Sequence, residues 1–308
     1  MKGVVMAGGQ GTRLRPLTSN QPKPMLPIVG RPMMEHVLLL LREHGITEVV
    51  TTVQFLASVV RTYFGDGTDL GLSLAYATEN EPLGTAGGVK NAEHFLDDTF
   101  LVISGDQVSD IDLAEAVKFH RDRGAAATVV LKHAENPLEF GIVIVDDDGR
   151  IERFLEKPGW GDVFSDTINT GIYILEPELL AQIPAGEEFD FAADLFPLLL
   201  EKGFPLYGYI AEGYWADVGT QEAYMEVHRD ILDGDVRLDV GGFELRPGVW
   251  LGEGAEVDPA AEVEGPAYIG ENTRIEAGAR IRDHTVMGKG VVVKGGAFLH
   301  RAVVHDNA

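Results

Sequence analysis

Cysteine is absent from this chain of 308 residues, and so are long apolar runs. The lack of cysteine excludes disulfides, zinc sites built on thiolates and cysteine nucleophiles, and we expect a cytoplasmic protein. A membrane span needs about 18–20 consecutive apolar residues, whereas the longest candidate run, residues 37–41, ends at Arg42 and Glu43. The start, Met1-Lys2-Gly3 directly before an apolar strand pattern, does not resemble a signal peptide.

Basic residues are also scarce, with 25 Lys and Arg against 49 Asp and Glu and a formal net charge of −24. This balance argues against nucleic acid and anionic membranes as partners, because both are bound through clustered Lys and Arg. An enzyme acting on nucleotides can still be acidic overall, since it needs only a local group of cations and a divalent metal ion. The length and the 45% hydrophobic content indicate a globular chain of about two domains.

Strand and helix patterns alternate over residues 1–235, which we interpret as one catalytic domain. Strands are expected at residues 2–7, 48–54, 72–78, 100–104, 126–131, 141–145, 151–155, 168–175 and 206–210. Helices are expected at residues 32–44, 56–64, 85–95, 113–123, 177–182, 192–202 and 221–232. This alternation predicts a Rossmann-like α/β fold, with a mixed, mainly parallel sheet flanked by helices and a site at the carboxyl ends of the strands.

A period of six replaces this pattern after a linker at residues 236–248. Over residues 249–308 the third hexad positions are Leu251, Val257, Val263, Ile269, Ile275, Ile281, Met287, Val293 and Leu299. Nine matches predict a short parallel β-helix of about three coils. The next third position is His305, so either the register slips by one and Val304 points inward, or the repeat continues in a longer protein.

Glycines dominate the loop after the first strand, with Gly8, Gly9 and Gly11 followed by Arg13. Such a loop turns tightly and brings backbone N–H groups to an anion. Arg13 and Lys23, the latter inside Pro22-Lys23-Pro24, add positive charge. A Walker loop is excluded because no Gly-Lys-Ser/Thr follows, and a dinucleotide fingerprint is excluded because Leu14 stands where its third glycine belongs. These residues predict a loop that grips a nucleoside triphosphate.

The glycine loop with Pro-Lys-Pro, the α/β domain and the hexads together resemble the sugar nucleotidyltransferases, or nucleoside-diphosphate-sugar pyrophosphorylases. Within them the chain looks most like bacterial mannose-1-phosphate guanylyltransferases. The resemblance implies a GT-A-like domain, a left-handed β-helix, Mg²⁺ as cofactor, and transfer of a nucleotidyl group from a nucleoside triphosphate to a sugar 1-phosphate with release of pyrophosphate.

The resemblance also assigns roles to residues that match the family's motifs. Ala7, Gly8, Gly9, Gly11 and Thr12 would bind the nucleotide. The expected catalytic residues are Arg13, Lys23 and Asp106, and the expected metal ligands are Asp106 and Asp217. The sugar phosphate would be bound by Gly141, Glu156, Lys157, Asn169 and Thr170.

The base would be read by the stretch that contains Glu79, Gly84 and Thr85. Thymidylyl- and uridylyltransferase relatives carry glutamine at the position of Glu79. A carboxylate only accepts hydrogen bonds, which suits the adjacent N1–H and N2–H₂ donors of guanine. This favours GTP, and the alternative is that Glu79 faces solvent while backbone groups near Gly84 read the base.

Two other classes of function stay open at this point. A non-catalytic, pyrophosphorylase-like subunit would keep the fold, although the charged residues of the loop are all present here. A β-helix acyltransferase would use His284, His300 or His305 as a base, but three coils are few for that activity. We expect the β-helix to pack against the catalytic domain or another subunit, and the chain to form a homo-oligomer through it.

Overall fold

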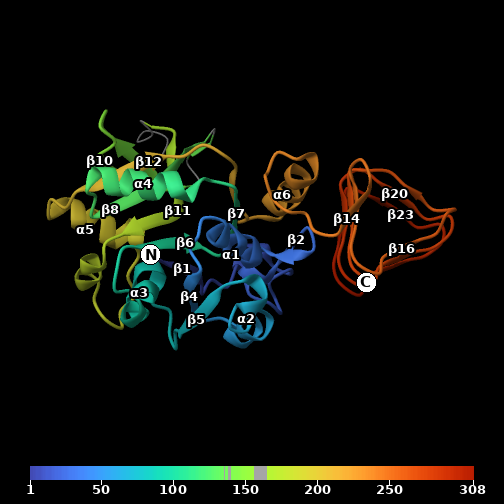
Figure 1. Cartoon of the computed structure of the whole chain (residues 1–308), viewed down its shortest axis with the longest axis horizontal. Coiled ribbons are helices and arrows are strands. Elements are labelled where there is room, and N and C mark those ends of the chain that lie inside the picture. The colour runs from blue at the N-terminus through green and yellow to red at the C-terminus, as the bar shows by residue number, and fades with distance from the viewer. Residues whose placement is uncertain (135, 138–139, 156–164) are drawn as a thin grey trace.

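The computed structural model describes residues 1–134, 136–137, 140–155 and 165–308. A nine-stranded sheet forms the α/β part (Figure 1). Its centre is parallel: β1 (Lys2–Ala7) lies between β4 (Glu48–Val53) and β6 (Phe100–Ser104), and β5 (Ser73–Thr78) pairs with β4. These strands match the apolar runs of the sequence because a parallel sheet is buried on both faces.

The other half of the sheet is mostly antiparallel. Strand β11 (Thr167–Leu175) pairs antiparallel with β6 and with β8 (Ala127–His133), and β12 (Leu206–Ile210) pairs parallel with β8. Strands β9 (Ile142–Val145) and β10 (Ile151–Leu155) form the edge beside β11. The mixed, mainly parallel α/β fold expected from the sequence is thereby confirmed.

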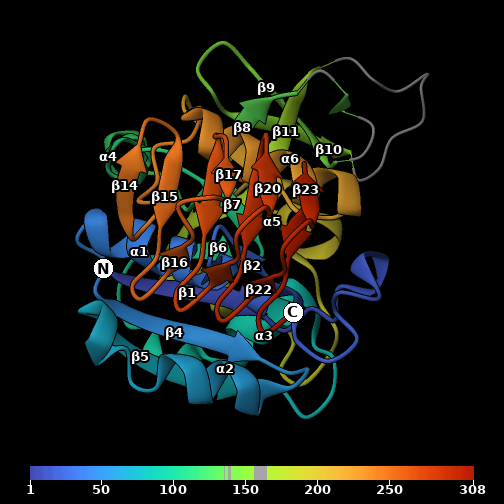
Figure 2. The same ribbon diagram turned by 90° about the vertical axis from the view of Figure 1, so that its right-hand side faces the viewer.

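Helices cover both faces of this sheet (Figures 1 and 2). One core contains Val5 and most of the buried apolar residues of α1 (Met33–Glu43), with those of α2 (Ala57–Phe64) and α4 (Leu113–Arg123). The opposite core contains Val4 with α3 (Gly84–Asn91) and α5 (Phe196–Glu201). Neighbouring residues of β1 thus serve opposite cores, as the alternation of side chains along a strand requires. Within the described residues no helix is long and apolar enough to cross a bilayer.

Helix α4 illustrates how local sequence sets the boundaries. Its buried residues, Leu113, Ala116, Val117 and His120, recur at the spacing of one helix face. Asp112 caps the start by accepting hydrogen bonds from the N–H groups of Ala114 and Glu115. Gly124 ends the helix in the left-handed conformation, with φ of 57°.

Several short elements have no counterpart among the sequence predictions. They are the hairpin of β2 (Pro27–Ile28) and β3 (Arg31–Pro32), and the antiparallel ribbon of β7 (Gln107–Ser109) and β13 (Trp215–Asp217). The helix expected at residues 177–182 is a 3-10 helix, and the one expected at 192–202 begins as a π-helix over Phe191–Leu195 before α5. Helix α6 (Gln221–Asp233) corresponds to the helix expected at residues 221–232.

The hexads form a parallel β-helix, red in Figure 1. Its three sheets stack at intervals of 18 residues, so that Leu251, Ile269 and Met287 lie above one another in the interior. The strands are β15 (Val249–Leu251), β16 (Glu256–Val257), β17 (Glu262–Val263), β18 (Ala267–Ile269), β19 (Arg274–Ile275), β20 (Arg280–Arg282), β21 (Thr285–Met287), β22 (Val292–Val293), β23 (Phe298–His300) and β24 (Val303–Val304). Before them, in the segment expected as a linker, β14 (Phe243–Arg246) pairs antiparallel with β15.

The register slips by one at the last coil, as one of the two sequence alternatives expected. Val304 pairs with Met287, 17 residues earlier, and belongs to the β-helix core, while His305 lies outside the strand. A valine in place of the histidine keeps the interior apolar, because an unpaired polar side chain there would be costly.

One sheet of the β-helix packs against the α/β part. Tyr268 and Val286 project from it into a core that includes Leu14, Leu26 and residues of α6. The turn of the β2–β3 hairpin fits this contact, since a Cβ on Gly30 would come within 2.5 Å of the Tyr268 hydroxyl. Figure 2 shows the β-helix lying in front of the α/β part. Packing against the same chain was one of the two expectations for this segment.

Candidate functional site

Four parallel strands end at the same edge of the sheet, and each is followed by residues of the candidate site. Ala7 is the last residue of β1 and is buried, so Gly8 and Gly9 begin the loop there. Gln54 follows β4, Glu79 follows β5 and Asp106 comes two residues after β6. The structure therefore brings residues from four distant parts of the sequence to one edge, as such sheets do.

The glycine loop has a shape that only glycine permits at one position. Gly11 has φ of +63°, and a Cβ there would lie 2.7 Å from the Cβ of Lys23. The hydroxyl of Thr18 donates a hydrogen bond of 2.7 Å to the carbonyl of Gly11 and fixes this approach. A 3-10 helix, Thr12–Leu14, follows, and buried Leu14 anchors it while Thr12 and Arg13 stay exposed.

Lys23 lies at the centre of the site, in a 3-10 helix that spans Lys23–Met25. Its Nζ is 2.8 Å from an oxygen of Asp106 and 3.0 Å from an oxygen of Asp217, and only 7% of the Lys23 side chain is exposed. Burial alone would lower the pKa of Lys23, but the two carboxylates outweigh it and the pKa is raised. Lys23 therefore carries a fixed positive charge between the two carboxylates.

The short β7–β13 ribbon places the second of these carboxylates. Asp217 pairs with Gln107, the residue after Asp106, so the ribbon brings the two aspartates to one place although they are far apart in sequence. The guanidinium of Arg13 lies 3.9 Å from the other oxygen of Asp217 and passes close to Gly219. Two cations and two carboxylates thus meet beside the glycine loop.

A cavity of about 330 Å³ opens next to the glycine loop. Five of the predicted nucleotide-binding residues line it, namely Gly8, Gly9, Glu79, Gly84 and Thr85, whereas Ala7, Gly11 and Thr12 do not. Its other lining residues are Met6, Gln10, Thr52, Gln54, Pro82, Leu83, Glu188 and Asp190. The cavity has the size of a small-ligand site and combines backbone groups of glycine with a few polar side chains.

Two of the lining residues also hold the cavity wall together. Gly84 has φ of +70°, and a Cβ there would lie 2.6 Å from the carbonyl oxygen of Phe189. The hydroxyl of Thr85 donates to Asp190 at 2.8 Å and accepts from the N–H of Phe191 at 2.9 Å. The hydroxyl of Thr85 therefore already donates one hydrogen bond and accepts another within the protein.

Glu79 is buried within this cavity, with 9% of the residue exposed. Burial raises the pKa of Glu79, and a hydrogen bond of 3.4 Å from the N–H of Leu83 opposes this only in part. The alternative in which Glu79 faces bulk solvent does not match this geometry.

The predicted sugar-binding residues lie around strand β11. The side chain of Asn169 accepts from the N–H of Gly171 and donates to the hydroxyl of Tyr173, and its backbone N–H donates to the carbonyl of Gly141. The hydroxyl of Thr170 donates to the carbonyl of Val130 at 2.7 Å and is buried. Glu156 and Lys157, the two charged residues expected here, lie outside the residues that the structure describes.

Sequence reasoning missed Trp215, which joins the two halves of the site. Its indole N–H donates to the side chain of Gln107 at 2.7 Å and to the carbonyl of Thr170 at 3.0 Å. Its ring packs edge-on against Phe140, with centroids 5.5 Å apart. The signal lay in Tyr214-Trp215-Ala216-Asp217, where only the aspartate was predicted to belong to the site.

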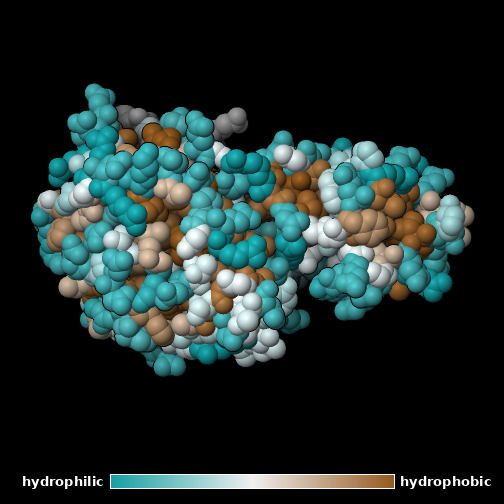
Figure 3. All heavy atoms as spheres, viewed as in Figure 1, coloured by the Kyte–Doolittle hydropathy of each residue, from teal (hydrophilic) through white to brown (hydrophobic). Residues whose placement is uncertain are grey.

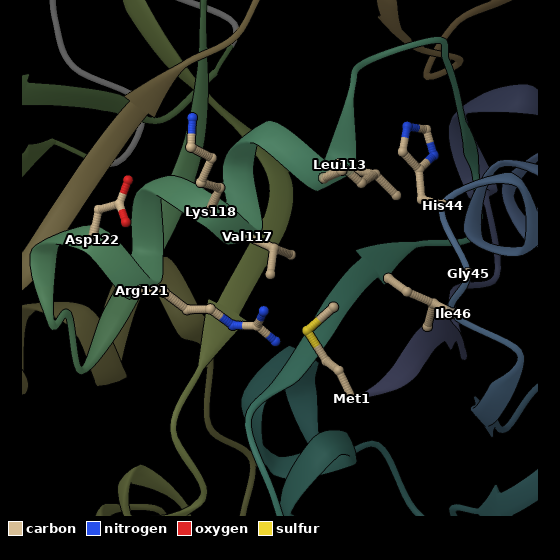
Figure 4. Close-up of a pocket in the computed structure, with 10 residues that line it drawn as sticks. Met1, His44, Gly45, Ile46, Leu113, Val117, Lys118, Arg121 and Asp122 are labelled. Carbon is tan, nitrogen blue, oxygen red and sulfur yellow. The ribbon is translucent and has the colours of Figure 1, made fainter.

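A second cavity, of about 380 Å³, lies at the amino ends of the strands and contains none of the predicted site residues (Figure 4). Met1 and Ile46, which precede β1 and β4, face Leu113, Val117 and Arg121 of α4 there. Within the described part of the chain, no three or more His, Cys, Asp or Glu side chains are grouped to hold a metal ion. A metal at Asp106 and Asp217 would therefore need oxygen ligands from substrate or water.

Two of the three histidines considered as a base, His284 and His300, lie against carboxylates. His284 lies between two carboxylates, 2.7 Å from Asp233 and 2.5 Å from Asp283, so both ring nitrogens are occupied. His300 also pairs with Asp283, at 3.4 Å. The contact of His284 with Asp233 ties the β-helix to the end of α6.

Comparison with known proteins agrees with this geometry. The family model described as nucleotidyl transferase matches residues 2–234. The chain is 41% identical over 285 residues to a UTP–glucose-1-phosphate uridylyltransferase of Synechocystis sp., covering 87% of this chain and 74% of the relative. It is 38% identical over 281 residues to a mannose-1-phosphate guanylyltransferase of Mycobacterium tuberculosis, covering 85% and 78%.

The fold has solved counterparts as well. The crystal structure of HddC from Yersinia pseudotuberculosis complexed with GMP-PN superposes with a TM-score of 0.63 at 25% identity, covering 73% of this chain and 97% of that one. The family model, the relatives above 30% identity and the gathering of the glycine loop with Lys23, Asp106 and Asp217 agree, and the chain belongs to the nucleotidyl transferase family.

Proposed function

We propose that the protein transfers a nucleotidyl group from a nucleoside triphosphate to a sugar 1-phosphate, and that its substrates are GTP and mannose 1-phosphate, giving GDP-mannose and pyrophosphate. One observation carries this proposal: the ammonium of Lys23 lies between Asp106 and Asp217 beside the glycine loop. This arrangement supplies charge of both signs where phosphates react. The names of the relatives support transfer to a sugar 1-phosphate.

The reaction needs no covalent intermediate with the protein. An oxygen of the sugar phosphate attacks the α-phosphorus in line, and pyrophosphate leaves with the bond electrons. Lys23 stabilises the charge that develops at the α-phosphate, and Arg13, which is exposed at the mouth of the site, holds the outgoing phosphates. Positioning and charge stabilisation therefore account for the catalysis.

Asp106 and Asp217 fit a divalent cation because their carboxylates already converge on one cation, the ammonium of Lys23. Mg²⁺ bound there would neutralise phosphate charge during the transfer. The two aspartates would supply oxygen ligands, which Mg²⁺ prefers, with phosphates and water completing the shell.

The sugar 1-phosphate would lie along β11, near Gly141 and Asn169. Trp215 and Phe140 form an apolar wall beside this region. The side chains of Asn169 and Thr170 already hydrogen-bond within the protein, so they would shape this pocket. We propose that Glu156 and Lys157 supply direct polar contacts. Thr170 would reach the sugar through its backbone only.

The choice of GTP rests on Glu79, whose carboxylate lines the cavity and can accept from two adjacent donors of guanine. A uridylyltransferase acting on glucose 1-phosphate is the second candidate, because the 41% identical relative bears that name. A thymidylyltransferase and a non-catalytic subunit are the remaining alternatives.

The test is pyrophosphate release with Mg²⁺, crossing GTP, UTP, dTTP, ATP and CTP with mannose and glucose 1-phosphates. Release only with GTP and mannose 1-phosphate supports the full proposal. Preference for UTP or dTTP with glucose 1-phosphate keeps the reaction and rejects the substrates. No release from any pair, with folded protein, favours the non-catalytic subunit.

We further propose the division into a catalytic domain (1–235), a linker (236–248) and the β-helix (249–308), and self-association through the β-helix. Exposed apolar side chains on the β-helix, Val292 and Phe298, and on the adjoining strand β14, Phe243 and Leu245, support this. The face in Figure 3 likewise shows apolar residues gathered over α6 and the β-helix. Sedimentation as a monomer at micromolar concentration would reject self-association. A cytoplasmic location stays a prediction.

A further inference from the structure

Glu79 is a buried acid with few protein partners. Its one described hydrogen bond comes from the N–H of Leu83 at the long distance of 3.4 Å, and it belongs to none of the ion pairs among the described residues. Two glycines leave it room: a Cβ on Gly88 would come within 2.6 Å of its Oε1, and a Cβ on Gly8 would lie 3.6 Å from the same atom. The two glycines thus leave space around the carboxyl of Glu79, and no positively charged side chain in the described part of the chain pairs with it there.

Among the described residues, no cation of the neighbouring elements pairs with Glu79, and Arg61 of α2 donates instead to the hydroxyl of Thr78. The glycine loop contributes Gly8, Gly9 and Gln10 to the cavity, and the end of β4 contributes Thr52 and Gln54, all of them uncharged. Across the cavity the charged groups are the carboxylates of Glu188 and Asp190. Glu81, on the same segment as Glu79, is acidic too, and the single lysine of α3, Lys90, is paired with Glu93 at 2.5 Å.

An acid held this way can meet a ligand in either protonation state. Burial raises its pKa, and no neighbouring charge restores the usual value. As a carboxylate it only accepts hydrogen bonds, whereas as a carboxylic acid it donates one and accepts another. The ligand therefore decides which form is the stable one.

These two forms match two classes of base. Guanine presents two adjacent donors, N1–H and N2–H₂, which suit the carboxylate. Uracil presents one donor, N3–H, beside the acceptor O4, which suits the carboxylic acid in the way that a glutamine amide would. We infer that Glu79 reads the base in two protonation states, selecting guanine when ionised and uracil when protonated.

This inference rests on the proposed function, because it takes the cavity at Glu79 as the base site. It predicts opposite proton linkage for the two nucleotides. GTP binding favours loss of the proton from Glu79 and UTP binding favours its retention. Because each base binds one form, the ratio of the two dissociation constants changes tenfold in favour of GTP for each unit rise in pH.

The experiment measures the dissociation constants of GTP and UTP by calorimetry on the full chain between about pH 5.5 and 8.0, below the range where the bases themselves titrate. Taking the ratio at each pH cancels the titration of the phosphates, which both nucleotides share. We expect the logarithm of the ratio to rise with a slope near one. A flat ratio, with both nucleotides bound, overturns the inference and leaves the proposed function intact.

Two variants identify the titrating group. Glu79→Gln keeps the size of the side chain, and it should prefer UTP at every pH with a flat ratio. Glu188→Gln removes another carboxylate from the same cavity and should keep the slope of the unchanged protein. A slope that survives in Glu79→Gln, or is lost in Glu188→Gln, assigns the effect elsewhere and overturns the inference. If GTP binds and UTP binds at no pH, the inference is overturned and the proposed function stands. If neither nucleotide binds at any pH, the proposed function itself is rejected.

Discussion

Replacing Lys23 by methionine is the change that separates chemistry from folding in this site. Methionine nearly keeps the length of the side chain and removes the ammonium. The ammonium lies 2.8 Å from Asp106 and 3.0 Å from Asp217. Its loss removes one fixed charge from the reacting phosphates, and a lost preorganised contact of this kind lowers turnover about 100- to 1000-fold, or about 3–4 kcal/mol of the barrier.

The cost to stability is smaller. Asp106 and Asp217 lose their shared partner, but their side chains are 29% and 31% exposed, so water partly replaces it. We expect a loss of about 1–3 kcal/mol in the free energy of unfolding. For a chain of this size that corresponds to a fall of roughly 2–12 °C in Tm. Lys23→Met should therefore be folded and almost inactive at room temperature.

The assay is pyrophosphate release at saturating substrates, run beside thermal unfolding of the same preparation. Lys294→Met is the matched control, since Lys294 also pairs with a glutamate at 3.0 Å but is 73% exposed on the β-helix. It should change neither turnover nor Tm measurably. A folded Lys23→Met protein with more than about a tenth of the normal turnover would refute the catalytic role, because a lost oxyanion-type contact costs more.

Three further changes test other parts of the argument. Gly11→Ala forces a Cβ to 2.7 Å from that of Lys23 at φ of +63°, so we expect a loss of about 1–3 kcal/mol in the free energy of unfolding, and unchanged urea unfolding would contradict the close approach. Trp215→Phe removes the hydrogen bonds to Gln107 and Thr170, and should raise KM for the sugar 1-phosphate more than KM for the nucleotide, both read from initial rates. Burial lowers the pKa of His36 to about 4 and of His228 to about 3, so each stays neutral when folded and takes up a proton when unfolded below about pH 6.5. Stability is therefore full above that pH and falls by up to about 1.4 kcal/mol per pH unit per histidine toward pH 4, and urea unfolding with a midpoint independent of pH would contradict this.

The parts of the site that lie within one stretch of sequence were predictable, and the pairings between stretches were not. The glycine loop and the aspartate after β6 follow directly from buried strands, so an apolar run and its following residues were enough to place them at one edge of the sheet. The ion pair of Lys23 with Asp217 joins residues 194 positions apart. It depends on the β7–β13 ribbon, whose strands of three residues each are too short to leave a periodic signal.

The burial of individual side chains in the site was also not predictable from the sequence. Glu79 was expected at the base, but its enclosure comes from Gly8 and Gly88 in other elements. Thr170 was expected to contact the sugar, yet its hydroxyl bonds to Val130 of the neighbouring strand β8. A motif names the residues of a site, whereas the direction of each side chain depends on strands that pair across the sheet.

The side of the β-helix that packs on the α/β part can be recognised in the sequence when residues 18 positions apart are compared. The third hexad positions point inward and are apolar on all three sides, so they do not distinguish the sides. The positions just before them point outward, and they repeat on each side every 18 residues. On one side they are Trp250, Tyr268 and Val286, and this is the side that packs on the α/β part. On the others the first two coils carry charged residues, Glu256, Arg274, Glu262 and Arg280, which favour water. Burying three apolar side chains stabilises the contact, whereas burying unpaired charges would oppose it. Reading the outward positions at period 18 therefore predicts which side of such a β-helix packs against its own chain.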